Sequence, residues 1–429
     1  MSRELRVQGL ALSQIAEQFG TPLYVYDSEV MIASYQELRD SLPPSVDIFF
    51  SLKANPNLSV CALFGSLGAG AEVSSLAELT TALRAGVKPA DIIFVGPGKT
   101  DEELRACLRA RVHAVVCESA AELQRLEELA GREAEAGHLT EGDRQRAMLR
   151  INPDFSVTGA GLSMGGKPRQ FGIDLAAAAS LGPALSRLRY VQVTGIHAYL
   201  GTRFLDAADI VRNTARILAM AQDLARRLAI PLSTVDVGGG LGVAYFDGEK
   251  DPDLSALAAG LREVIPTAQD ASRRLIMETG RFLTATAGTY VVRVLDVKES
   301  MGETFVITDG GTNHHMAAVG LGSFVKRNFP VVALNGCTED GQAPPYTVCG
   351  PLCTPEDVIA RRVRLPRLSV GDLIGLQRSG AYGSTASPGL FLSHGYPAEV
   401  MVHEGRAHLI RVRDGVDDLL SKQRALSFS

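Results

Sequence analysis

VTGIHAYLGTRFLDAADIVRNTARILAMAQDLARRLAIPLSTVDVG (193–238) contains the pattern that decides the fold. Two short runs rich in β-branched residues, VTGIHAY (193–199) and TVDVG (234–238), are typical of buried strands. Between them, residues 207–229 carry apolar side chains at helical spacing, which predicts a long amphipathic helix. A strand, a helix and a second strand in this order form one unit of a parallel sheet.

The same alternation recurs along much of the chain. Helix-like stretches such as SLAELTTALRAG (75–86) separate most of six further strand-like runs, which are IFFSLK (48–53), AGAEV (69–73), IIFVG (92–96), AVVCE (114–118), AMLRI (147–151) and RLIMET (274–279). Eight strands alternating with helices over about 250 residues predict an α/β fold of the (β/α)8 or TIM-barrel type. An open doubly wound sheet contains the same units. No GxGxxG follows the first strand, however, which weakens the dinucleotide-binding version of that sheet.

The pattern changes after about residue 283. The later runs predict strands joined by turns with no long helix between them: TYVVRVLDVKES, TFVITDGG, YTVCGPLC, DLIGLQRSG and AEVMVHEGRAHLIRVRD. They indicate an all-β domain over residues 283–429. PLYVYD (22–27) also predicts a strand, and we expect residues 1–27 to join this β domain while residues 28–282 form the barrel.

Length and composition indicate a globular protein of two domains. The chain has 429 residues, of which 46% are hydrophobic and 21% charged, so a disordered chain is excluded. A net charge of -5 argues against a protein that binds nucleic acid or an anionic membrane. No apolar run has the roughly 18 residues of a membrane helix, and no signal-peptide core is present, so we expect a cytoplasmic protein. The six cysteines form no CxxC pair, which argues against zinc and disulfides.

Polar residues that could do chemistry stand where the predicted barrel strands end. Functional side chains of a (β/α)8 barrel gather at the carboxyl ends of its strands. The residues found there are Lys53, Glu72, Arg150, His197, Tyr199, Gly238, Gly239, Gly240, Glu278 and Arg281. We therefore expect them to converge on one rim of the barrel.

Three of these features together predict a pyridoxal phosphate site. Backbone N–H groups of a triple glycine can approach a phosphate, and although a plain turn explains three glycines equally well, the neighbouring Arg281 favours the phosphate. Lys53 at a buried strand end can form an imine with an aldehyde. Glu278 is then placed to act as the carboxylate partner of a pyridine nitrogen.

Seven motifs, in order, carry a resemblance to a known family: YVYD, SLKAN, GAGAEVSSLAEL, DVGGGLG, ETGR, GPLCTPEDV and SGAYG. From about residue 12 to its last strand, the chain resembles the fold-type III pyridoxal phosphate-dependent amino-acid decarboxylases. That family includes the ornithine/arginine and diaminopimelate decarboxylases. The resemblance implies an alanine-racemase-like barrel, a C-terminal β domain and a homodimer with its active sites at the subunit interface.

The resemblance also implies roles for individual residues. Lys53 would be the cofactor lysine, and Glu278 would hold the pyridinium, which favours decarboxylation because racemases on this barrel place an arginine there. Cys353 would reach in from the other subunit and protonate the carbon left by decarboxylation. Asp309 would lie near the substrate. The resemblance implies further residues at the cofactor: Glu72, Arg150, Gly238, Gly239, Gly240, Gly280, Arg281 and Tyr382.

Three departures from the family pattern bear on the substrate. In the family a histidine stacks on the cofactor ring, and the aligned position here is Tyr199. Because His197 stands two residues earlier, either side chain could face the ring. In the same segment, Thr202 replaces a phosphate-binding serine. Thr354 stands where an acidic residue recognises a distal amino group. SPGLFLSHGYPAEV (387–400) replaces the arginine-containing segment that holds a distal carboxylate.

The chain also resembles a narrower branch of this decarboxylase family. Four segments carry this likeness: MGGKPRQFGID (164–174), GIHAYLGT (195–202), GGGLGVAYF (238–246) and GPLCTPED (350–357). Members of this branch decarboxylate an amino acid held as a thioester on an acyl-carrier protein, of glutamyl or 3-methylaspartyl type, in antibiotic biosynthesis. A thioester-bound substrate has no free distal group, which agrees with the departures. An acidic carrier would need a basic docking site, for which Arg203 is the better candidate and the Arg361–Arg367 cluster the weaker.

Two alternatives remain open from the sequence. The protein could decarboxylate a free amino acid of the diaminopimelate or ornithine type. It could also be a non-catalytic, decarboxylase-like binding protein, although the joint presence of Lys53, Glu278, Arg281 and Cys353 argues against this.

Overall fold

The computed structural model describes residues 4–139, 142–155, 159–265, 273–319, 327–335 and 343–428. The chain divides into two compact units. The β unit comprises residues 1–31, 245–249 and 283–429, and the barrel unit comprises residues 32–244 and 250–282. Within the described ranges, no helix has both the length and the apolar character needed to span a membrane.

The barrel unit contains a closed ring of eight parallel strands, which confirms the predicted TIM barrel. The strands are β4 (Val46–Ser51), β5 (Gly70–Val73), β6 (Ile92–Phe94), β7 (Ala114–Cys117), β8 (Gln145–Asn152), β11 (Val191–His197), β13 (Thr234–Gly239) and β14 (Arg274–Thr279). Their order is β8-β11-β13-β14-β4-β5-β6-β7, and pairing of β7 with β8 closes the ring. Side chains from several strands, including Phe49, Ile93, Met148 and Ile276, fill the interior, so the barrel is a packed core.

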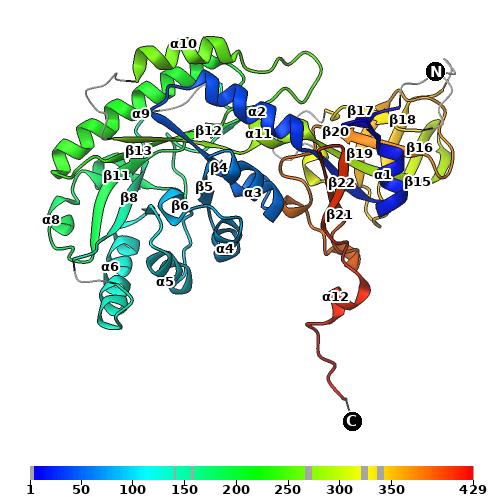
Figure 1. Ribbon diagram of the computed structural model, residues 1–429. Coiled ribbons are helices and arrows are strands. Elements are labelled where there is room, and N and C mark those ends of the chain that lie inside the picture. Colours follow the sequence, from blue (N-terminus) through cyan, green and yellow to red (C-terminus); the bar gives the residue numbers. More distant parts are fainter. Residues whose placement is uncertain are drawn as a thin grey trace. The chain divides into compact units, whose positions relative to one another are not determined.

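Helices lie outside this ring of strands, as Figure 1 shows. The principal ones are α2 (Ser28–Ser41), α3 (Leu58–Ser66), α4 (Leu76–Arg84), α5 (Asp101–Ala110), α6 (Ala120–Glu135), α9 (Ala207–Leu228) and α10 (Leu254–Val264). Local sequence explains where they begin: Thr100 and Glu103 form a reciprocal capping box at α5, and Asp206 accepts a hydrogen bond from Ala208 N at α9. Shorter elements complete the unit: β9 (Leu162–Ser163), β10 (Ile173–Asp174), α7 (Leu175–Ala178), α8 (Gly182–Leu185), β12 (Gly201–Thr202) and α11 (Arg281–Thr284).

The β unit is built from both ends of the chain. One sheet runs β19-β18-β16-β15-β3-β21-β22, with β20 paired to β15 and β17. Its strands are β3 (Leu23–Asp27), β15 (Gly288–Ser300), β16 (Glu303–Thr308), β17 (Val331–Ala333), β18 (Tyr346–Cys349), β19 (Val358–Val363), β20 (Leu373–Gln377), β21 (Ala398–His403) and β22 (Arg406–Arg411). The N-terminal β1 (Arg6–Val7), β2 (Leu10–Ala11) and α1 (Leu12–Phe19) and the C-terminal α12 (Val416–Leu420) belong to the same unit. β3 lies between β15, which runs antiparallel to it, and β21, which runs parallel.

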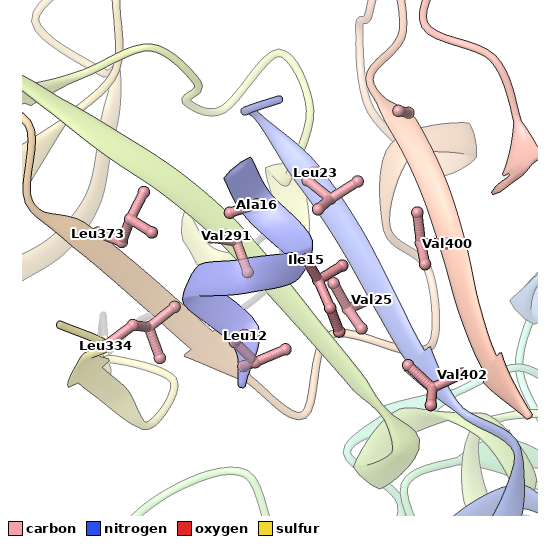
Figure 2. Packing of buried hydrophobic residues seen from close by; sticks show 11 residues of the cluster. Leu12, Ile15, Ala16, Leu23, Val25, Val291, Leu334, Leu373, Val400 and Val402 are labelled. Carbon is pink, nitrogen blue, oxygen red and sulfur yellow. The ribbon is translucent and has the colours of Figure 1, made fainter. Parts of the chain in front are cut away.

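An apolar cluster holds helix α1 on this sheet. Figure 2 shows Leu12, Ile15 and Ala16 of α1 facing side chains from β3, β15, β20 and β21. Leu12 and Val291 are completely buried, and Leu23 and Val400 are as well. The cluster therefore joins segments from the two ends of the chain through burial of apolar surface.

We expect Leu12→Ala to lower the free energy of unfolding by about 2–5 kcal/mol, because it removes buried methyl groups and leaves a cavity. Leu426→Ala is the matched control, since Leu426 is 74% exposed. Thermal and urea unfolding of both variants would test this expectation. Equal loss in the two variants would contradict the assignment of α1 to the core.

Candidate active site

Lys53 stands at the carboxyl end of the barrel above two buried carboxylates. Strand β4 ends at Ser51 and continues as a short 3-10 helix, Leu52–Ala54, which carries the lysine. Its Nζ lies 2.9 Å from Glu72 Oε2 and 3.6 Å from Glu278 Oε2. The lysine side chain is 36% exposed, whereas each of the two carboxylates is 1% exposed. The lysine side chain is therefore accessible to solvent, while its ammonium charge is paired with the carboxylates of Glu72 and Glu278.

Two further buried polar side chains, His197 and Asp236, lie on the neighbouring strands β11 and β13. His197 Nε2 donates a hydrogen bond of 2.9 Å to Glu278 Oε1, and His197 lies opposite Asp236 in the register of β11 and β13. Asp236 Oδ1 accepts a hydrogen bond of 2.8 Å from Gly238 N. His197 Nδ1 and Asp236 Oδ2 are buried and have no hydrogen-bond partner among the described residues. The described residues thus leave these two polar atoms of His197 and Asp236 without a hydrogen bond.

The pKa values of the two acids of this group, Glu278 and Asp236, are shifted in opposite directions. Burial raises the pKa of Glu278, but the charge of Lys53 and the hydrogen bond from His197 outweigh it and lower the pKa to about 2. Burial, with the nearby Glu278 carboxylate, holds the pKa of Asp236 well above its usual range. Glu278 therefore stays ionised at neutral pH, as a carboxylate that pairs with a pyridinium must.

Tyr199, rather than His197, presents its ring to the lysine. Lys53 Nζ lies 5.1 Å from the centroid of the Tyr199 ring. His197 is completely buried and is held by Glu278. Tyr199 therefore adjoins the amine and His197 contacts the carboxylate, and which of the two faces the cofactor ring stays a prediction.

The end of β13 is a stretch of backbone that only glycine can form. A Cβ atom on Gly239 would lie 1.7 Å from the carbonyl oxygen of Glu278, and one on Gly240 would lie 2.2 Å from that of Gly201. Gly238 and Gly240 also have positive φ angles of 67° and 96°. Arg281 begins the short helix that follows the adjacent strand β14. Backbone N–H groups without neighbouring side chains and a guanidinium are the donor types that bind a phosphate.

Gly280, immediately before Arg281, packs against the lysine segment. A Cβ atom on Gly280 would lie 2.6 Å from Cβ of Ala54. The absence of a side chain at Gly280 therefore lets β14 and the Lys53 segment approach each other closely.

Arg150 is already paired within the barrel. Its Nη1 donates a hydrogen bond of 2.7 Å to Glu118 Oε1, and its guanidinium lies 4.8 Å from the centroid of the Phe171 ring. Glu118 also accepts hydrogen bonds from Gly96 N and Gly172 N. Glu118 and Asp236 are not among the residues predicted from the sequence. Glu118 directly follows β7 in AVVCE, where an acidic residue at a strand end was the available signal, whereas Asp236 lies within β13.

Four more of the predicted residues lie at two other places. In the barrel unit, Thr202 ends β12, which pairs with Leu162–Ser163, and Arg203 follows with a positive φ of 62°. In the β unit, Cys353 is exposed in the loop between β18 and β19, with Thr354 beside it. Their roles stay predictions.

Two further predicted residues belong to the β unit. Tyr382 has a positive φ of 54°, which is rare for a bulky side chain and is often associated with functional sites. Asp309 accepts hydrogen bonds from Thr21 Oγ1 and Arg293 N, and burial raises its pKa. Both oxygens of the Asp309 carboxylate are therefore engaged within the β unit, and its predicted role near the substrate is untested.

These features define the class of protein: a pyridoxal phosphate enzyme on an alanine-racemase-like barrel with an attached β domain. The sequence profile described as "Pyridoxal-dependent decarboxylase, pyridoxal binding domain" matches residues 29–285. The chain belongs to this family of pyridoxal-dependent decarboxylases, and it is a carboxy-lyase that uses pyridoxal phosphate.

Relatives of known function and solved structures agree with the family. The L-glutamyl-[BtrI acyl-carrier protein] decarboxylase of Niallia circulans is 36% identical over 417 residues, covering 96% of each chain. The diaminopimelate decarboxylase of Pseudomonas aeruginosa is 32% identical over 425 residues, covering 99% of this chain and 97% of the relative. The crystal structure of diaminopimelate decarboxylase from M. jannaschii has a TM-score of 0.88 at 27% identity, with 99% and 97% of the two chains covered.

The residues of the barrel rim fit the cofactor. An accessible amine, an ionised buried carboxylate and a glycine backbone beside an arginine are the three groups that an aldehyde, a pyridinium and a phosphate require. The unsatisfied buried atoms of His197 and Asp236 lie in the same group of side chains.

The pKa of Glu278 predicts a pH-dependent contribution to stability. Its ordinary pKa is 4.5 and its pKa in the folded chain is about 2. Its stabilising contribution is therefore complete above the ordinary value and is lost as the pH falls through the folded value. We expect Glu278→Gln to lower the urea midpoint of the cofactor-free protein more at about pH 7 than at about pH 2.5.

Glu263→Gln, at an exposed position of α10, serves as the control for loss of one surface carboxylate. A difference between wild type and Glu278→Gln that is the same at both pH values would show that the carboxylate is not held ionised by its neighbours.

Proposed function

We propose that the protein decarboxylates an amino acid carried as a thioester on an acyl-carrier protein, of glutamyl, aspartyl or 3-methylaspartyl type, in natural-product biosynthesis. The observation that supports this most is the 36% identity, over 96% of both chains, to a decarboxylase whose name specifies a carrier-bound glutamyl substrate. Diaminopimelate decarboxylases match over a similar length at 28–32% identity, so a free amino acid is the second candidate substrate.

Two features of the β unit favour the carrier-bound substrate. Thr354, beside the exposed Cys353, has no charge with which to bind a distal amino group. The segment 387–400 presents Leu390, Phe391 and Leu392 with 62%, 47% and 48% of their surface exposed. An apolar surface of this kind suits the uncharged arm of a thioester better than a distal carboxylate.

The residues of the barrel rim have distinct roles in this proposal. Pyridoxal phosphate supplies the electron sink for the electron pair that remains on Cα when the carboxylate leaves. Lys53 would hold the cofactor, and the ionised Glu278 keeps the proton on the pyridine nitrogen. His197 would fix the orientation of Glu278 through its hydrogen bond, and Tyr199, beside the Lys53 amine, would face the cofactor ring.

The phosphate of the cofactor would be bound by the glycine backbone together with charged and hydroxyl side chains. Gly238, Gly239 and Gly240 have no side chains to hinder a phosphate, although the Gly238 N–H already donates to Asp236 Oδ1, and Arg281 supplies a fork of donors. Gly280 allows this segment to approach, and Thr202 and Tyr382 offer hydroxyl groups. Glu72 and Arg150 act from the barrel side, Glu72 by pairing with Lys53 and Arg150 by its charge near Glu278.

The active site in this proposal is shared by a homodimer. Cys353 of the partner subunit returns a proton to Cα after carbon dioxide leaves, and Asp309 and Thr354 lie near the substrate. Arg203, after β12, would bind the phosphate of the carrier's phosphopantetheine arm, since arginine binds phosphate in a bidentate manner. Loss of affinity for the loaded carrier in Arg203→Ala, with cofactor binding retained, is the expected result.

The substrate is tested by incubating the protein and pyridoxal phosphate with aspartate, 3-methylaspartate and glutamate, each free or loaded on a carrier. Intact-mass measurement of the carrier reports loss of carbon dioxide. We expect loss from a loaded carrier and none from the free amino acids. Turnover of a free amino acid alone would replace this proposal with an ordinary amino-acid decarboxylase.

Two variants test the roles at the barrel rim. Lys53→Ala should abolish the absorbance band of lysine-bound pyridoxal phosphate, because the amine is lost. Glu278→Gln should keep that band but lower kcat by about 10²-fold or more, because a neutral amide cannot hold the pyridinium proton. An unchanged kcat in Glu278→Gln would refute its role.

A further inference from the structure

The loop that carries Cys353 is held by a buried carboxylate. It spans residues 350–357, between the end of β18 and the start of β19. Cys353 is exposed, whereas Asp357, at the end of the loop, is 2% exposed. A hydrogen bond of 3.1 Å from Gly350 N to Asp357 O closes the base of the loop.

The Asp357 carboxylate connects this loop to a second one. Its Oδ2 accepts a hydrogen bond of 2.8 Å from the backbone N–H of Leu352, the residue before Cys353. Its Oδ1 accepts from Thr312 N at 2.7 Å and from Thr312 Oγ1 at 2.9 Å. Thr312 is 4% exposed and lies in the loop that follows strand β16, so this second loop is buried at the contact. Three donors therefore fix the carboxylate between the two loops.

The residue on the other side of Cys353 is also fixed. Thr354 N donates to Leu352 O at 2.9 Å, and Asp357 N donates to Thr354 O at 3.2 Å. These bonds form a tight turn around Cys353. The backbone on both sides of the thiol is thus set by Asp357, directly at Leu352 and through its own N–H at Thr354.

Close packing of two glycines leaves this arrangement little freedom. A Cβ atom on Gly311 would lie 2.2 Å from Asp357 Oδ1 and 2.7 Å from Cα of Gly350. The two loops approach so closely that their separation is set by backbone contact. Movement of the Asp357 carboxylate would therefore also move the Cys353 loop.

We propose that Asp357 is a positioning residue that sets where the Cys353 thiol delivers its proton. The inference rests on the proposed function, in which Cys353 of the partner subunit protonates Cα. In that step the C–C bond to the carboxylate breaks, carbon dioxide leaves, and the electron pair stays at Cα. The thiol S–H bond then breaks, a C–H bond forms at Cα, and the thiolate takes a proton from solvent. A thiol held at one place delivers that proton to one face of Cα.

The test is decarboxylation in deuterium oxide by the holoenzyme, with the stereochemistry of the deuterium at Cα measured by NMR of the product. The wild type should place deuterium on one face. Asp357→Asn puts N–H groups where an acceptor is needed, so we expect deuterium on both faces and a kcat lower by about 10–100-fold with little change in KM. Loss of overall stability alone would lower the amount of active enzyme without mixing the two faces.

Two further variants accompany this test, one as a control and one as a weaker perturbation of the same contact. Asp372→Asn changes an aspartate that accepts a backbone hydrogen bond from Ser369 in a different loop, and it should leave the labelling on one face. Thr312→Val removes one of the three donors and should mix the faces to a smaller extent. It provides the same test if Asp357→Asn does not fold.

Cys353→Ala separates this inference from the function on which it rests. Single-face labelling in Asp357→Asn and Thr312→Val, together with mixed labelling in Cys353→Ala, would overturn the positioning role of Asp357. Single-face labelling in Cys353→Ala would instead remove the proton-donor role of Cys353, and with it the basis of the inference.

Discussion

The burial of three carboxyl groups around one amine constrains the whole barrel rim. A buried carboxylate without a partner is costly, and Lys53 alone cannot neutralise Glu72, Asp236 and Glu278. The surroundings shift the pKa values of two of these groups in opposite directions. Lys53 and His197 lower the pKa of Glu278 and keep it ionised, whereas burial and the nearby Glu278 carboxylate raise the pKa of Asp236. A cofactor with a cationic ring nitrogen adds the positive charge that such a site lacks, so the electrostatics of the rim and the chemistry of the family agree.

Much of this fold and part of this site could be predicted from the sequence. The strands of the barrel follow from short apolar runs, and the polar residues at their ends follow from the rule that function collects there. The motifs around Lys53, Glu278 and Arg281 identify the cofactor class. Short local patterns carry this information because each describes a single strand and the turn that follows it.

What the sequence could not predict depends on which strands become neighbours. Glu118 pairs with Arg150 because β7 and β8 close the barrel. The choice between His197 and Tyr199 depends on the direction of two side chains at the end of β11. The contact between Asp357 and Thr312 joins loops 45 residues apart in sequence, so neither motif alone reveals it. These features are properties of packing, and they appear only in three dimensions.

The central place of β3 has a consequence for how the protein is made. Its two neighbours in the sheet, β15 and β21, lie far along the chain, and Leu23 is opposite Ala398. A ribosome adding roughly 5–20 residues per second takes on the order of tens of seconds to supply the second neighbour. Both edges of β3 lack their native partners until β15 is made, and the edge that pairs with β21 lacks its partner throughout that time; unpaired strand edges attract other chains. The barrel can form before synthesis ends, but the β domain has to wait for the last part of the chain. Chaperone binding to the nascent N-terminal segment would protect the protein at this stage.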